Sequence, residues 1–384
     1  MSCMPISTSA IRCPHFPLSC IADPIAEKIK GLWEKIKTTL GGWIRDFFFF
    51  PLARNLPASL LQEKEGLYVK QFFSAEGPLD PNFPAQEEIR KTFSLEEKEI
   101  SLSIEGNKKI SLTYRVLEPK TTDSLSNYNF VLLLGNRFTV HNNATGIYPY
   151  LSSYLDLKRE NPSLPSGRFF LVSQYNLSHE GKPYRPSSLQ EAGLILTLAL
   201  ASLKKEYGDI HQCVGHSLGC ILLASALSHL VHQPDLTPKN LFFDRGPSSI
   251  KEISHSEHIG KLLFPLIQAL GWSIDVGKEI YNFMQSLSRQ GVRIPHVVIG
   301  GVEHDHYFSQ QKNLYHSKEI ESLHKEKKVE RLLFDPPKQV FHERAHHNLG
   351  THYLHPCYLQ DGSSPAFMRQ GESLSHALLR HSVR

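Results

Sequence analysis

The sequence predicts an α/β protein whose central, mostly parallel sheet is covered by helices on both faces. From about residue 97 onward, short apolar runs alternate with longer segments of helical periodicity, a pattern typical of parallel strands joined by helices. The run at 130–134 is apolar without interruption, as expected of a strand buried on both faces. A hydrophobic content of 40% suits a folded chain and excludes wholesale disorder.

The expected elements begin with a hairpin. Apolar and polar residues alternate over 100–104 and again over 110–116, and Glu105-Gly106-Asn107 separates the two runs. The segment 187–206 begins with serine and carries lysines near its end, as a capped helix does. By the same reasoning we expect strands at 130–134, 169–172, 211–214, 241–243 and 296–299, and helices at 219–231 and 250–290.

The first 22 residues predict a disordered start. Residues 1–22 are rich in Ser, Thr and Pro, and they lack the basic and apolar regions of a cleavable signal peptide. The sequence contains no stretch of about 18 apolar residues, so we expect no transmembrane helix. We therefore expect a cytoplasmic protein.

Residues 23–96 are expected to form an amphipathic helix and an extension. The helix opens well at Asp23-Pro24, and its apolar stripe includes Ile29 and Trp33, with lysines off that stripe. A helix of this kind can lie in a membrane interface, so peripheral membrane contact through residues 23–51 is one interpretation. Packing of the same stripe on the protein's own core is the other.

Charge and cysteine usage exclude two further classes. The chain has 42 Lys and Arg against 38 Asp and Glu, a net charge of +4, which is too balanced to make nucleic acid the expected partner. The 6 cysteines form no CxxC pair, which favours free thiols over a disulfide framework or a zinc knuckle.

The strongest motif is Gly215-His216-Ser217-Leu218-Gly219, which fits G-x-S-x-G. An apolar strand is expected before it and an apolar helix after it, so the serine would lie on a tight strand-to-helix turn. Glycine on both sides gives room for such a turn. Ser217 is therefore our candidate nucleophile, and the backbone N–H of Leu218 is a candidate oxyanion donor.

With this motif, the chain resembles the α/β-hydrolase superfamily, specifically its serine lipases and esterases, over roughly residues 97–350. The resemblance implies an α/β-hydrolase domain at 97–352, a helical cap at about 250–292 and a tail at 353–384. Two apolar clusters in the cap favour acyl-chain substrates. Through the segment 244–249 and the His-rich closing part, the chain also resembles the chlamydial CHLPS protein family, which implies no substrate.

The resemblance also implies the chain order serine, acid, histidine. The acid of the family normally follows the strand that we place at 296–299, so Asp305 is the predicted acid. A variant of the family takes the acid from the end of the preceding strand, where Asp244 lies. The other interpretation of Asp244 is an ion pair with a neighbouring arginine or a loop cap.

The catalytic histidine is expected on a loop after the final strand. His342, His346 and His347 are candidates, of which His347 fits the family pattern best and His346 is the alternative. The second oxyanion donor of the family follows an earlier strand, where the N–H of Asn136 or Arg137 would serve. The resemblance implies no metal and no organic cofactor.

Two rival classes remain open. Residues 342–346 read His-Glu-x-x-His, which on a helix binds Zn²⁺ in metallopeptidases, and His352 follows at the spacing of a third ligand. Leu349 stands where the metzincin pattern has glycine, and Pro336-Pro337 leaves little room for a helix. A non-catalytic binding protein on a hydrolase scaffold is the third class. We predict a serine hydrolase of ester or thioester bonds that acts on lipid-like acyl substrates.

Overall fold

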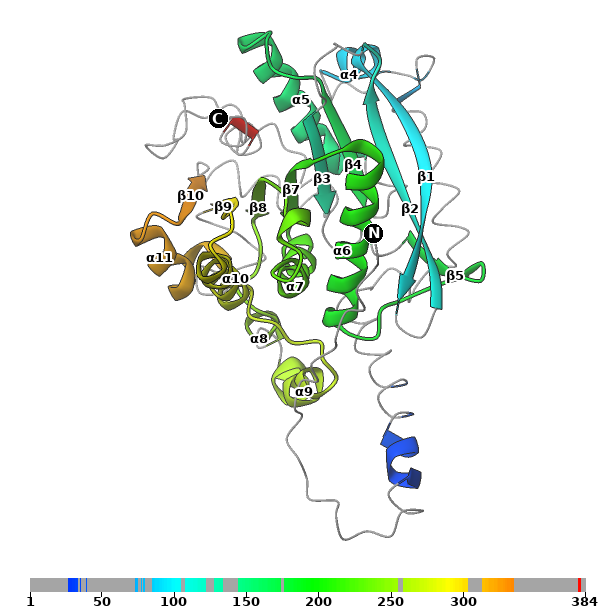
Figure 1. The fold of residues 1–384 in the computed structure, drawn as a ribbon, viewed down its shortest axis with the longest axis vertical. Coiled ribbons are helices and arrows are strands. Elements are labelled where there is room, and N and C mark those ends of the chain that lie inside the picture. The colour runs from blue at the N-terminus through cyan, green and yellow to red at the C-terminus, as the bar shows by residue number, and fades with distance from the viewer. Residues whose placement is uncertain are drawn as a thin grey trace.

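The computed structural model describes residues 27–33, 35, 39, 73–74, 77, 79, 85–104, 108–121, 128–133, 144–173, 176–254, 258–302, 313–334 and 379–380 of the chain. Most of these residues belong to one sheet and to the helices that cover it (Figure 1). The predicted strands and hairpin are present, and the boundaries lie within a few residues of those expected.

The sheet has a parallel part and an antiparallel edge. Within the described residues its order is β10-β9-β8-β7-β3-β4-β2-β5-β6, with β1 paired to β2. The parallel part consists of β10, β9, β8, β7, β3 and β4. Strands β1, β2, β5 and β6 form antiparallel pairs. The strands are β1 (Phe93–Ile104), β2 (Lys108–Pro119), β3 (Tyr128–Leu133), β4 (Gly167–Val172), β5 (Leu177–His179), β6 (Lys182–Pro183), β7 (Ile210–His216), β8 (Asn240–Asp244), β9 (His296–Val302) and β10 (Val329–Phe334).

Helices cover both faces of this sheet, because the central strands are apolar on both. In β3, Val131 and Leu133 join one buried cluster, and Phe130 and Leu132 join the other. The helices are α4 (Gln86–Thr92), α5 (Ala144–Glu160), α6 (Leu189–Tyr207), α7 (Gly219–Leu230), α8 (Ile250–Ser254), α9 (His258–Ala269), α10 (Val276–Gln290) and α11 (Lys318–Lys325). The first cluster contains residues of α6, α7, α10 and α11, and the second contains residues of α4 and α5. The predicted fold class is therefore confirmed.

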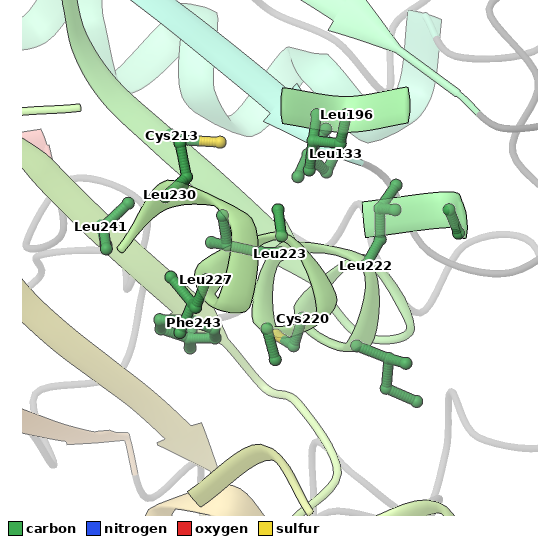
Figure 2. Close-up of a cluster of buried hydrophobic side chains, with 14 of the residues drawn as sticks. Leu133, Leu196, Cys213, Cys220, Leu222, Leu223, Leu227, Leu230, Leu241 and Phe243 are labelled. Carbon is green, nitrogen blue, oxygen red and sulfur yellow. The ribbon is translucent and has the colours of Figure 1, made fainter. Parts of the chain in front are cut away.

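Helix α7 is the most deeply buried of the helices that contribute to the first cluster. Figure 2 shows Leu223 and Leu227 of α7 near Leu133, Leu241 and Phe243 of the strands, and all five are buried in the same cluster. An apolar helix such as α7, in which Ser228 is the one exposed residue, is stable in water only when neighbours cover nearly all of it. Helices α6 and α10 provide this cover, since both contact α7. Helix α7 is thereby held between the sheet and helices α6 and α10.

The segment expected to be helical from 250 to 290 forms three helices. Gly271, which has φ +74°, lies between α9 and α10, and the side chain of Asp275 caps α10 by accepting from the N–H of Lys278. Helix α10 packs against α7 and α11 and buries Ile280 and Leu287 in the first cluster. It thus covers the sheet, and a cap over the serine from this region stays a prediction.

The described part of the N-terminal helix is exposed. Residues 27–33 are helical, and Ile29, Leu32 and Trp33 are 45%, 60% and 42% exposed. Core packing of the apolar stripe is therefore not observed for these residues. Among the described residues, no helix is both long and apolar enough to cross a membrane. The rest of the segment 1–72 lies almost wholly outside the described residues.

Candidate active site

The candidate nucleophile lies on a strained turn between a strand and a helix. Strand β7 ends at His216 and helix α7 begins at Gly219, so Ser217 and Leu218 form the turn. Ser217 has φ +53°, a left-handed conformation that residues with a Cβ rarely adopt. Backbone strain of this kind, at a serine between a strand and a helix, is concentrated at functional sites.

The two glycines of the motif are required by close backbone contacts. A Cβ added at Gly219 would lie 2.0 Å from the carbonyl oxygen of Leu133 on β3, and one at Gly215 would lie 2.7 Å from the carbonyl oxygen of Gly219. Neither contact is with a flexible side chain, so neither position accepts a larger residue without movement of the backbone. The spacing G-x-S-x-G thus has a steric cause here, and it brings β3 against the turn.

The two backbone N–H groups of the turn differ in their partners. The N–H of Ser217 donates to the carbonyl oxygen of Asp244 at 2.9 Å, which ties the turn to the end of β8. Within the described part of the chain, the N–H of Leu218 has no backbone acceptor. An N–H at the start of a helix that is not engaged by the backbone is a suitable donor to a developing oxyanion.

Asp244 lies beside the nucleophile turn and is fully buried. In the register of β7 and β8 it lies opposite His216. Its Oδ2 accepts from His216 Nδ1 at 2.8 Å, from the hydroxyl of Tyr150 at 2.7 Å and from Arg245 Nη2 at 2.8 Å. Its Oδ1 accepts from Arg245 Nε at 2.9 Å. Both oxygens of this carboxylate are therefore engaged by neighbouring donors.

The charge state of this cluster follows from burial and from Arg245. Burial acts to raise the pKa of Asp244, but the charge of Arg245 and the contact with His216 outweigh it and hold this pKa far below its usual value. Burial, followed by the charge of Arg245, lowers the pKa of His216. Burial, followed by the charge of Asp244, raises the pKa of Tyr150. The cluster is thus an ionised Asp–Arg pair with two neutral donors, and the imidazole donates from Nδ1.

Some of the predicted site residues are among the described residues, and others are not. Ser217, Leu218 and Asp244 lie together at the carboxyl ends of β7 and β8. The ion pair of Asp244 with a neighbouring arginine, which was one interpretation of the sequence, is present. The remaining candidates all lie outside the described residues: Asn136, Arg137, Asp305, His342, His346, His347 and the His-Glu-x-x-His segment at 342–346.

The strands that precede those remaining candidates end at the same edge as β7. Strand β3, which is next to β7 and parallel to it, ends just before Asn136, and β9 ends just before Asp305. Strand β10 pairs parallel with β9 and precedes the candidate histidines. In open parallel sheets, ligands bind at the carboxyl edge of the strands. The topology is therefore compatible with the predicted set.

The sequence did not predict the cluster of Tyr150, His216, Asp244 and Arg245. Local motifs identify Ser217, but Tyr150 and Asp244 are separated by 94 positions. The sequence offered two signals: Asp244 directly follows the strand predicted at 241–243, and an ion pair of Asp244 with a neighbouring arginine was one interpretation. Among the described residues, no group of three or more His, Cys, Asp and Glu could hold a metal ion.

No protein-family model matches the chain, and no curated protein matches it. Solved structures similar to it include the acylaminoacyl peptidase of Pyrococcus horikoshii (TM-score 0.42, 16% identity, 67% of this chain and 39% of that chain). Fungal esterases of Rhizomucor miehei (TM-score 0.40, 11% identity, 73% and 82%) and a ferulic acid esterase (TM-score 0.41, 13% identity, 64% and 91%) are also similar. The chain thus spans well under half of the peptidase. Likenesses at these TM-scores carry no argument about activity, and the fold rests on the chain's own topology.

Proposed function

We propose that the protein is a serine hydrolase that cleaves ester or thioester bonds through Ser217. The observation that carries this proposal is the conformation of Ser217, at φ +53° between two glycines that the backbone requires. A strained serine costs folding free energy, of the order of 1–3 kcal/mol, and such strain is concentrated at functional sites. An ordinary turn at this place would be more stable with glycine or asparagine.

The proposed reaction proceeds through an acyl-enzyme. Ser217 Oγ attacks the acyl carbon, and His347 takes the hydroxyl proton and then delivers it to the leaving alkoxide or thiolate. Water, deprotonated by the same imidazole, releases the acid. Asp305 orients His347, and the N–H groups of Leu218 and Asn136 donate to the oxyanion. His346 is the alternative base.

The choice of Asp305 over Asp244 is supported by the contacts of Asp244. Its carboxylate already accepts four hydrogen bonds from Tyr150, His216 and Arg245, and it is fully buried. A catalytic histidine would have to compete with those donors.

A lipid-like acyl substrate is the substrate class that we propose. Its support is the exposed apolar side chains of Ile29, Leu32 and Trp33 on the N-terminal helix, which suit an enzyme that contacts a membrane surface through residues 23–51. The proposal includes no metal and no organic cofactor.

Labelling with a fluorophosphonate probe tests the activity. We expect the wild-type chain to be labelled and Ser217→Ala not to be, with hydrolysis of p-nitrophenyl esters reduced by about 10⁴-fold or more. Ser228→Ala is the matched control, because this serine is on the exposed side of α7 and bonds only within the helix, to the carbonyl oxygen of Ser225. Folded wild type that is not labelled, or equal labelling of Ser217→Ala, would contradict the proposal.

A further inference from the structure

We propose that Cys220 is a positioning residue that holds the nucleophile turn, Ser217 and Leu218, in the conformation from which Ser217 attacks. This inference rests on the proposed function, because it concerns the nucleophile of the same reaction. Cys220 is the second residue of α7 and takes no part in the bond-breaking steps. It acts on the turn through the backbone groups that it contacts.

Backbone hydrogen bonds hold both polar groups of Ser217. Its N–H donates to the carbonyl oxygen of Asp244 at 2.9 Å, and its carbonyl oxygen accepts from the N–H of Cys220 at 3.0 Å. A strained conformation such as φ +53° persists only where the surrounding contacts over-determine it. Cys220 provides the one of these two bonds that comes from the helix side of the turn.

The side chain of Cys220 supplies a further contact on each side of the turn. Its Sγ donates to the carbonyl oxygen of Gly215 at 2.9 Å and lies 3.6 Å from that of Asp244, which also accepts from Ser217. Gly215 belongs to β7 and Asp244 ends β8, whereas Cys220 is in the first turn of α7. One sulfur atom therefore links the three elements that meet at the nucleophile.

Two glycines leave the space that Cys220 fills. A Cβ added at Gly246 would lie 2.5 Å from the Sγ of Cys220, and one added at Gly215 would lie 2.9 Å from its Cα. Cys220 itself is fully buried. Because protein interiors are close-packed, removal of the sulfur would leave a gap beside the turn and would remove the contacts that hold it.

The thiol of Cys220 is a hydrogen-bond donor and not a second nucleophile. Burial, followed by the charge of Asp244, raises the pKa of Cys220 well above its usual value, so the thiol keeps its proton at neutral pH. Reactive cysteines have the opposite properties, a lowered pKa and an accessible sulfur. The proton that the bond to Gly215 requires is therefore present at the pH of an esterase assay.

The position of the turn matters most in the transition state. An oxyanion forms only there, so a small displacement of Ser217 or of the N–H of Leu218 weakens transition-state binding more than substrate binding. Loss of the thiol should therefore lower kcat and leave KM nearly unchanged. A contact that served folding alone would lower the melting temperature without this effect on kcat.

Cys220→Ala and Cys213→Ala provide the matched test. Cys213, on β7, is also fully buried in the first cluster (Figure 2), but among the described residues its thiol has no hydrogen-bond partner. Both changes remove one sulfur from the same cluster. We expect Cys220→Ala to lower kcat for p-nitrophenyl butyrate and the rate of fluorophosphonate labelling by about 10-fold or more, with KM nearly unchanged. Cys213→Ala should lower the melting temperature and keep kcat within about twofold.

Cys220→Ser tests the hydrogen bond by conservative rescue, because a hydroxyl can donate to the same carbonyl oxygen. We expect this variant to retain most of the kcat that Cys220→Ala loses. Equal losses in the two variants would overturn the positioning role of the thiol, as would a kcat in Cys220→Ala equal to that of wild type or of Cys213→Ala. Folded wild type without labelling would overturn the proposed function and this inference together, whereas labelled wild type with unaffected Cys220→Ala would overturn this inference alone.

Discussion

At the scale of single residues, the nucleophile is the position where local preference and tertiary structure disagree most. Ser217 adopts a left-handed conformation at φ +53°, although an L-residue there is less stable by about 1–2 kcal/mol than in a right-handed one. The N–H bond to Asp244 and the contact of Gly219 with β3 hold it in place. The strain is therefore compensated by contacts on both sides of the turn.

This strain can be measured without any substrate. We expect Ser217→Gly to have a free energy of unfolding about 1 kcal/mol higher than Ser217→Ala, because only glycine adopts φ +53° without a steric cost. Urea denaturation followed by circular dichroism provides the comparison. At an ordinary right-handed turn the sign would be reversed, since alanine is stiffer than glycine in the unfolded chain; a more stable alanine variant would therefore argue against a strained elbow.

At the scale of elements, the sequence predicts those strands, helices and turns that have a periodic or local sequence pattern. The hairpin of β1 and β2 and the turn from β7 to α7 follow from alternation and from one motif, and all are present. Strand β10 was not predicted, because Glu330 and Arg331 interrupt its apolar pattern. Helix α5 was not predicted either, and it carries Pro149 among its residues. The bond from Tyr150 to Asp244 depends on which helix covers which face, and a local pattern does not contain that information.

The N-terminal helix is an element with its own prediction. Because Ile29, Leu32 and Trp33 are exposed at helical spacing, we expect the chain to float with vesicles of anionic phospholipid. Replacing these three residues together by serine should strongly reduce flotation, since it removes the exposed large apolar side chains of residues 27–33. Gly31→Ala is the control, because a Cβ at this position would have no contact within 4 Å beyond its chain neighbours and the helix's own backbone. Unchanged flotation of the triple variant would reject membrane contact through this face.

At the scale of the whole molecule, the sheet gathers distant parts of the chain along one edge. Strands β3, β7, β8, β9 and β10 run parallel, so the segments that follow them start at the same edge. The residues predicted from the motif and the resemblance follow four of these strands. Strand β8 ends at Asp244, and Arg245 follows it. The carboxylate of Asp244 and the imidazole of His216, at the end of the neighbouring β7, are both buried between these strands.

Burying a neutral histidine there makes stability depend on pH. Burial lowers the pKa of His216, so below about pH 6.5 the unfolded chain binds a proton that the folded chain does not bind. The free energy of unfolding should therefore fall as the pH falls from 7 to 5. The lowered pKa values of His211 and His229, which also have burial as their main cause, add to this slope. Asp244, whose pKa is held low, loses its contribution only below about pH 4.

The contribution of His216 can be isolated by comparing wild type with His216→Asn. The variant keeps a donor to Asp244 but has no titrating group at position 216. Its unfolding free energy should therefore depend less on pH between 7 and 5 than that of the wild type. The difference in slope is at most that of one proton, about 1.4 kcal/mol per pH unit. Urea denaturation at half-unit pH intervals measures both slopes. A variant with a slope equal to or steeper than that of wild type would mean that His216 is protonated in the fold, and the hydrogen bond to Asp244 would then be a salt bridge.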